Sequence, residues 1–114
     1  MDTAAFEAIQ AEMPWTDLWS EGHKKDPRSY KNLEHCLINI VAFAGDILKR
    51  IERADHYGAE YVQALNRDKD GEALSYIVMS AMKAANVHPQ GKIQLAPIMQ
   101  ADLTRRKETT NEQK

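Results

Sequence analysis

The amino-acid sequence predicts an all-α protein, a helical bundle of about four to five helices around one long central helix, residues 30–57. Apolar residues recur at helical spacing in several segments, and no stretch longer than four residues alternates as a strand does. The 114 residues include only five Gly and four Pro, which favours long helices over a turn-rich β-protein. With 43% hydrophobic and 28% charged residues, the composition is that of a soluble globular protein with one domain.

Charge and hydropathy argue against two classes of protein. The longest uninterrupted apolar run, Ile40–Ala44, is far shorter than the roughly 20 residues that cross a bilayer. The formal net charge is -2, and basic residues form short clusters in 23–31 and 104–114 instead of one face shared with aromatic residues. We therefore expect neither a membrane protein nor a nucleic-acid-binding protein.

The N-terminal part of the expected domain, residues 1–28, contains a first helix and a tryptophan-containing segment. Asp2 or Thr3 is suited to cap this helix, and Pro14 ends it at Met13. The same part lacks the basic region and apolar stretch of a signal peptide, so we expect a cytoplasmic protein.

Two tryptophans form the most conspicuous aromatic pair in the sequence. Trp15 and Trp19 are four residues apart, so both rings can face one side of a helical turn. Such a pair can close a small core or form a binding surface. Residues 1–22 also hold five acidic residues and no Lys or Arg, a composition suited to docking on a basic, apolar groove.

The central helix is expected from Tyr30 to Tyr57, with Gly58 as its stop. One apolar seam recurs at alternating steps of four and three residues, comprising Leu33, Leu37, Ile40, Ala44, Ile47 and Ile51. A second apolar row contains Ile38, Val41, Gly45 and Leu48. Because five short helices cannot cover so much apolar surface, we expect a homo-oligomer, a dimer at least.

Three polar residues interrupt the apolar part of this helix. His35, Asn39 and Asp46 share one narrow stripe, which is either the solvent edge of the bundle or the wall of a ligand site. The single cysteine, Cys36, is expected to be a buried structural residue. With no second cysteine for an intrachain disulfide, a reducing cytosol is the natural setting.

The second half of the core contains a short helix over 59–65, a polar turn, and a helix over 70–86. The turn matches the start of a calcium-binding loop, but Ile77 stands where that loop requires a bidentate carboxylate. We therefore interpret the turn as a cap for the next helix. A last helix is expected over 96–106, so that one domain spans 1–106, and residues 107–114 are expected to form a disordered tail.

Residues 33–106 resemble the short MazG-like members of the all-α nucleoside triphosphate pyrophosphohydrolase superfamily. The resemblance lies in the order and texture of the segments Leu33-Glu-His-Cys-Leu-Ile-Asn-Ile40, Arg53-Ala-Asp-His-Tyr-Gly58, Leu74-Ser-Tyr-Ile-Val78, Ala84-Ala-Asn-Val-His-Pro89, Ile93-Gln-Leu95 and Ala101-Asp-Leu-Thr-Arg-Arg106. It makes 30–106 a MazG-like core and implies cleavage of the α–β bond of a nucleoside triphosphate, which releases a monophosphate and pyrophosphate.

The family holds Mg²⁺ with an E-x-x-E pair on one helix and an E-x-x-D pair on the next. This sequence departs from both pairs, with Asn39 and Ala42 at the first and Glu72 and Ser75, or Ala73 and Tyr76, at the second. The resemblance therefore implies Mg²⁺ as cofactor and Glu72 as a metal ligand, and no catalytic residue is assigned. It also implies that His35, Asn39 and Asp46 line the substrate site.

Two functions remain open at this stage. The chain is a divergent pyrophosphohydrolase or nucleotide-binding relative with a nucleoside triphosphate as its ligand. Alternatively, it is a non-enzymatic helical interaction protein of phage or prophage type, which binds a host protein through Trp15 and Trp19.

Overall fold

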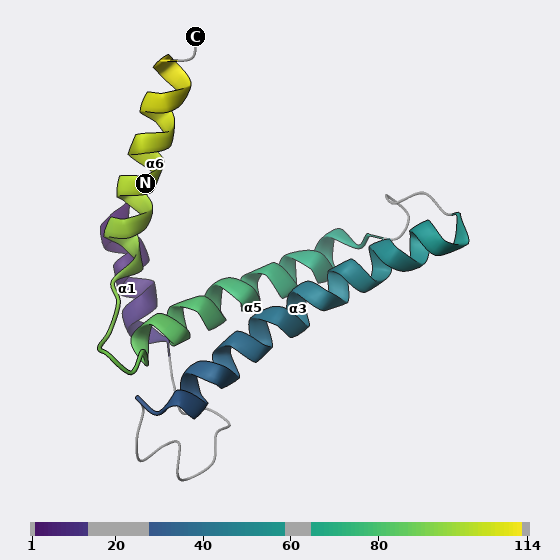
Figure 1. Ribbon diagram of the computed structural model, residues 1–114, viewed down its shortest axis with the longest axis horizontal. Coiled ribbons are helices and arrows are strands. Elements are labelled where there is room, and N and C mark those ends of the chain that lie inside the picture. Colours follow the sequence, from purple (N-terminus) through teal and green to yellow (C-terminus); the bar gives the residue numbers. More distant parts are fainter. Residues whose placement is uncertain (1, 14–27, 59–64, 113–114) are drawn as a thin grey trace.

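The computed structural model describes residues 2–13, 28–58 and 65–112. These residues form α1 (Thr3–Glu12), α3 (Tyr30–Tyr57), α5 (Arg67–Asn86) and α6 (Leu95–Glu112), with no strand among them (Figure 1). The all-α prediction is therefore confirmed. The tryptophans and the short helix expected over 59–65 involve positions outside the described residues.

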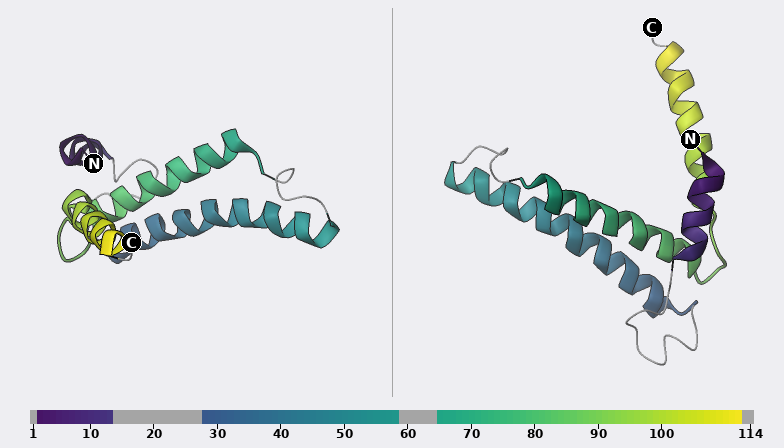
Figure 2. Two further views of the ribbon diagram at one scale, coloured as in Figure 1. Left: turned by 90° about the horizontal axis from the view of Figure 1, so that it is seen from above. Right: turned by 180° about the vertical axis from the view of Figure 1, so that it is seen from behind.

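Two long helices, α3 and α5, pack side by side as an antiparallel hairpin (Figures 1 and 2). The predicted bounds of α3 are confirmed, and Gly58 ends it in the left-handed region at φ 72°. Helix α5 begins three residues earlier than predicted because the Asn66 side chain caps it, accepting a hydrogen bond from the Lys69 amide at 3.0 Å. The polar turn is thus a helix cap, as interpreted from the sequence.

The seam between α3 and α5 is built from small side chains at one end and larger ones at the other. Near the start of α3, Cys36 packs with Ala84 and Val87, and Leu33 lies against this cluster. Further along, the rings of Phe43 and Tyr76 meet at a centroid distance of 5.0 Å. At the far end, Arg50 pairs with Asp70.

The predicted seam is wrong at one position. Leu37 is 49% exposed, whereas its neighbour Cys36 is buried. Successive residues on a helix are about 100° apart, so the choice between neighbours decides which one faces the partner helix. The small side chain of Cys36, and not Leu37, lies in the seam, where it packs against Ala84 of α5.

Helices α1 and α6 lie together at the end of the hairpin where α3 begins and α5 ends (Figure 1). The predicted start of α1 is confirmed: Asp2 is its N-cap and accepts a hydrogen bond from the Ala5 amide at 3.1 Å. Gln10, on the inner face of α1, is fully buried and bonds to Asn86 of α5 and to Ile93 and Leu95 at the start of α6. This side chain joins three helices.

The C-terminal helix is longer than expected. It starts at Leu95 with Pro97 in its first turn, as predicted, but continues to Glu112. The expectation of a disordered tail is therefore wrong for residues 107–112.

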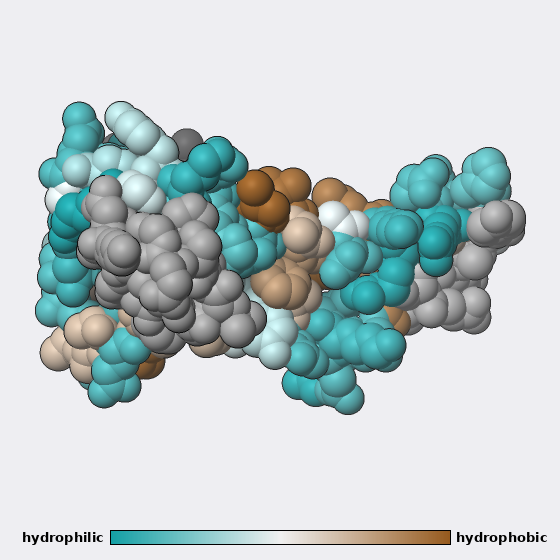
Figure 3. All heavy atoms as spheres, turned by 90° about the horizontal axis from the view of Figure 1, so that it is seen from below, coloured by the Kyte–Doolittle hydropathy of each residue, from teal (hydrophilic) through white to brown (hydrophobic). Residues whose placement is uncertain are grey.

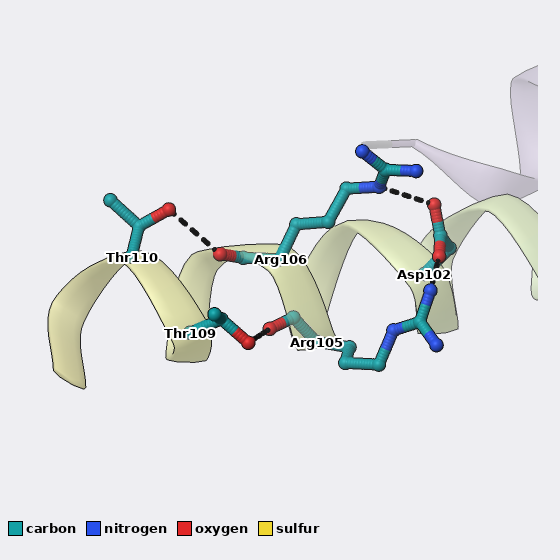
Figure 4. A network of polar contacts seen from close by, with 5 residues as sticks. All are labelled: Asp102, Arg105, Arg106, Thr109 and Thr110. Atoms are coloured by element: carbon teal, nitrogen blue, oxygen red, sulfur yellow. Dashed lines mark hydrogen bonds and ion pairs between the residues drawn. The ribbon is translucent and has the colours of Figure 1, made fainter. Parts of the chain in front are cut away.

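Polar side chains of α6 contact one another and the helix backbone (Figure 4). Asp102 pairs with Arg105 and Arg106 on the following turn, which is favourable at these spacings. The hydroxyls of Thr109 and Thr110 donate to the Arg105 and Arg106 carbonyl groups at 3.0 and 2.9 Å. The charged sequence that was expected to be a tail is thus helical as far as Glu112.

Candidate functional site

Two of the residues that sequence reasoning placed in a site lie on the same edge of the α3/α5 hairpin. Asp46 is three residues after Phe43 on α3, and Glu72 is four residues before Tyr76 on α5, so each shares a helix face with its ring. Because the two rings are in contact, the two carboxylates flank that contact from different helices. We call this the polar edge, comprising His35, Asn39, Asp46 and Glu72 around Phe43 and Tyr76.

The other two polar residues follow the same face of α3 toward its start. Asn39 is four residues before Phe43, and His35 is four residues before Asn39. On a helix these positions, with Asp46, fall within an arc of roughly 80°. Asn39 is half-buried, whereas His35, Asp46 and Glu72 are exposed. The polar edge is therefore open to solvent and runs along the hairpin instead of forming an enclosed pocket.

The most specific contact on the polar edge joins Glu72 and Tyr76. The Tyr76 hydroxyl donates to a Glu72 carboxylate oxygen at 3.0 Å. This hydrogen bond, together with the negative charge of Glu72, raises the pKa of Tyr76 above its ordinary value. Glu72 is thereby held beside the Tyr76 hydroxyl, and a carboxylate has further acceptor positions for a ligand.

The carboxylates of the described residues do not form a metal cage by themselves. No group of three or more His, Cys, Asp or Glu within 2–13, 28–58 and 65–112 is placed to hold a metal ion. In the polar turn, Asp70 is engaged by Arg50 and also accepts from the Asn66 amide at 3.3 Å. A cation on the polar edge would need oxygen ligands from its substrate, which is how Mg²⁺ is commonly bound beside phosphates.

Sequence reasoning missed the ring contact between Phe43 and Tyr76. Each ring lies close to predicted polar residues along its own helix, but only the register of α3 against α5 brings the two rings together. It also missed Gln10, a polar residue that is fully buried. The residues proposed for the alternative function, Trp15 and Trp19, lie outside the described residues, so that hypothesis stays a prediction.

Comparisons with known proteins leave the family assignment at the level of a resemblance. No family model matches this chain, and no curated protein or solved structure is detectably similar to it. Among the helices of the described ranges, none has the length and apolar character needed to cross a membrane. The arrangement of the polar edge is therefore the main structural basis for a functional proposal.

Proposed function

We propose that this protein binds a nucleoside triphosphate with Mg²⁺ along the polar edge, as a divergent relative of the MazG-like pyrophosphohydrolases. The observation that supports this most is the contact between Phe43 and Tyr76, because helical spacing then puts Asp46 of one helix and Glu72 of the other on the same edge of the hairpin. A carboxylate pair beside an aromatic ring offers charge for a cation and a surface for a base.

Each residue of the polar edge has a distinct part in this proposal. Glu72 and Asp46 are the carboxylates that would hold Mg²⁺, which would supply positive charge to the phosphates. Phosphate oxygens complete the coordination shell, because Mg²⁺ needs few protein carboxylates when a polyphosphate is present. Asn39 and His35 donate hydrogen bonds to the nucleotide, and the ring of Tyr76, 40% exposed, stacks on the base.

The same residues limit the chemistry. Cleavage of the α–β bond requires a water molecule and strong charge neutralisation of the phosphates. With two carboxylates on the edge, we expect nucleotide binding with slow turnover to a monophosphate and pyrophosphate. The cytosol supplies both Mg²⁺ and nucleoside triphosphates, and it suits a chain whose one cysteine is buried and has no second cysteine with which to form an intrachain disulfide.

Calorimetric titration of nucleoside triphosphates in the presence of Mg²⁺ tests the binding proposal. Replacing Glu72 by Ala should weaken binding about tenfold, the effect of losing one charge-assisted contact. The matched control is Glu52→Ala, because Glu52 is an exposed carboxylate of α3 on a different face from Asp46. Equal affinity of Glu72→Ala and the wild type would refute the assignment of Glu72.

The reaction is tested by separating products after incubation with a mixed panel of ribo- and deoxyribonucleotides and Mg²⁺ or Mn²⁺. Monophosphate and pyrophosphate are the expected products of any turnover. Release of orthophosphate would contradict the proposed bond cleavage.

A further inference from the structure

The side of the hairpin away from the polar edge is apolar and exposed. Val41 is two residues before Phe43, and Val78 is two residues after Tyr76, so both point away from the ring contact. We call the set the apolar face; its members, with their exposed fractions, are Leu37 49%, Ile38 56%, Val41 71%, Leu48 63%, Leu74 54% and Val78 49%. Figure 3 shows hydrophobic side chains gathered over the middle of the molecule.

The described residues bury few large apolar side chains within the single chain. Its buried hydrophobic residues are Cys36, Ala54, Met82, Ala84, Ala85, Val87 and Ala96, mostly small side chains. Six large aliphatic residues of α3 and α5 lie instead on the apolar face, where each is 49% or more exposed. An obligate interface has this character, because it resembles a protein core cut in half.

The extent of the apolar face matches what a stable dimer needs. From Tyr30, which is 79% exposed, to Leu48, α3 rises about 27 Å, and two adjacent helices are roughly 20 Å wide. The footprint is on the order of 500 Å², comparable with the ~800 Å² that each partner buries in a standard interface. Glu34 lies beside the face at its Tyr30 end, and no charged side chain of α3 interrupts the face between Leu37 and Leu48, as is typical of homodimer interfaces.

We propose that a second copy of this chain covers the apolar face, with α3 packed against the partner's α3. Such an interface is isologous, so the same row of side chains meets its own copy across a two-fold axis. Gly45 lies in this row between Val41 and Leu48, and a Cβ atom there would meet nothing within 4 Å in the single chain. The absence of a side chain lets the two helices approach closely.

Gly45 also supplies a test that spares the fold of the single chain. Gly45→Glu adds a good helix former to α3 and has open space around its Cβ, so the helix content should be kept. The added carboxylate would lie inside the proposed interface without a partner and should dissociate the dimer. Ile98→Glu is the matched control, because Ile98 is 57% exposed on α6, away from the apolar face.

Light scattering after size-exclusion chromatography measures the outcome at micromolar concentration. The wild type and Ile98→Glu should both have twice the 13.0 kDa mass of the chain, and Gly45→Glu should have the mass of one chain with unchanged far-ultraviolet circular dichroism. A wild-type mass of 13.0 kDa, or a dimer that survives Gly45→Glu, would overturn the proposal.

A second measurement decides the question if the glutamate variant does not fold. The thermal midpoint of the wild type should rise with protein concentration, because association of two folded chains stabilises the folded state by mass action. A midpoint that is independent of concentration would refute the second copy, leaving the face to another occupant.

Discussion

Replacing Gln10 tests whether the junction of α1, α5 and α6 is held by one buried amide. The side-chain nitrogen of Gln10 donates to the Asn86 side-chain oxygen at 3.0 Å and to the Ile93 carbonyl at 2.8 Å. Its oxygen accepts from the Leu95 amide at 3.3 Å. Gln10→Met keeps a similar volume and a good helix former but removes all three hydrogen bonds.

The expected loss follows from the hydrogen bonds removed. A hydrogen bond of this kind contributes about 0.5–1.5 kcal/mol, so the loss of three part-buried bonds gives about 3 kcal/mol. That is a large share of the free energy of unfolding of a small domain, which is roughly 5–15 kcal/mol. The Asn86 side chain retains its other bond, in which it donates to the Gln10 carbonyl at 2.8 Å, so the junction is weakened without losing every contact.

Urea denaturation followed by circular dichroism measures this loss at a fixed protein concentration. The control is Glu7→Ala, an exposed position of the same helix, which should change stability by less than about 0.5 kcal/mol. A loss below about 1 kcal/mol for Gln10→Met would show that the amide is not the main tie between the helices.

Three further predictions concern single residues. The pKa of Tyr76 is raised by its hydrogen bond to Glu72 and by the charge of that carboxylate, and Glu72→Gln removes the charge. The pKa of Tyr76 should therefore fall in a titration followed at the tyrosinate absorbance, and an unchanged pKa would refute the contact. Hydrogen bonding to Arg106 and the charges of both arginines lower the pKa of Asp102 below 3.8, so its contribution to helicity is present above that value and disappears as the pH falls through the lowered pKa. The helical signal of the wild type should therefore exceed that of Asp102→Asn above this range and match it below, and a constant difference would contradict the pairing. Gly58→Ala should destabilise the protein by about 1 kcal/mol in thermal denaturation, because φ is 72° there, and a gain in stability would argue against the left-handed cap.

The helices were predictable from the sequence wherever their ends are marked by local chemistry. Gly58 ends α3 and Asp2 caps α1, so these two boundaries follow from capping rules. Asn66 caps α5 by the same rule, but the start of α5 was predicted three residues too late. The end of α6 was not predictable from composition alone. Its charged sequence looks like a solvated tail, whereas the helix continues to Glu112.

The candidate site was predictable only within each helix. Periodicity placed His35, Asn39 and Asp46 on one stripe, which the structure bears out, but it could not relate that stripe to Glu72. That relation depends on the register of α3 against α5, which is fixed by the small side chains of Cys36 and Ala84 at one end. Tertiary packing of this kind leaves no local signal in the sequence.

The most direct test of the proposed function is an amide NMR titration of the protein with a nucleoside triphosphate and Mg²⁺. Binding along the polar edge should shift the amide signals of residues 35–46 and 72–76 in a saturable manner, and chelation of Mg²⁺ should reverse these shifts. No saturable shift with any nucleotide, or shifts confined to residues far from the polar edge, would contradict nucleotide binding at this site.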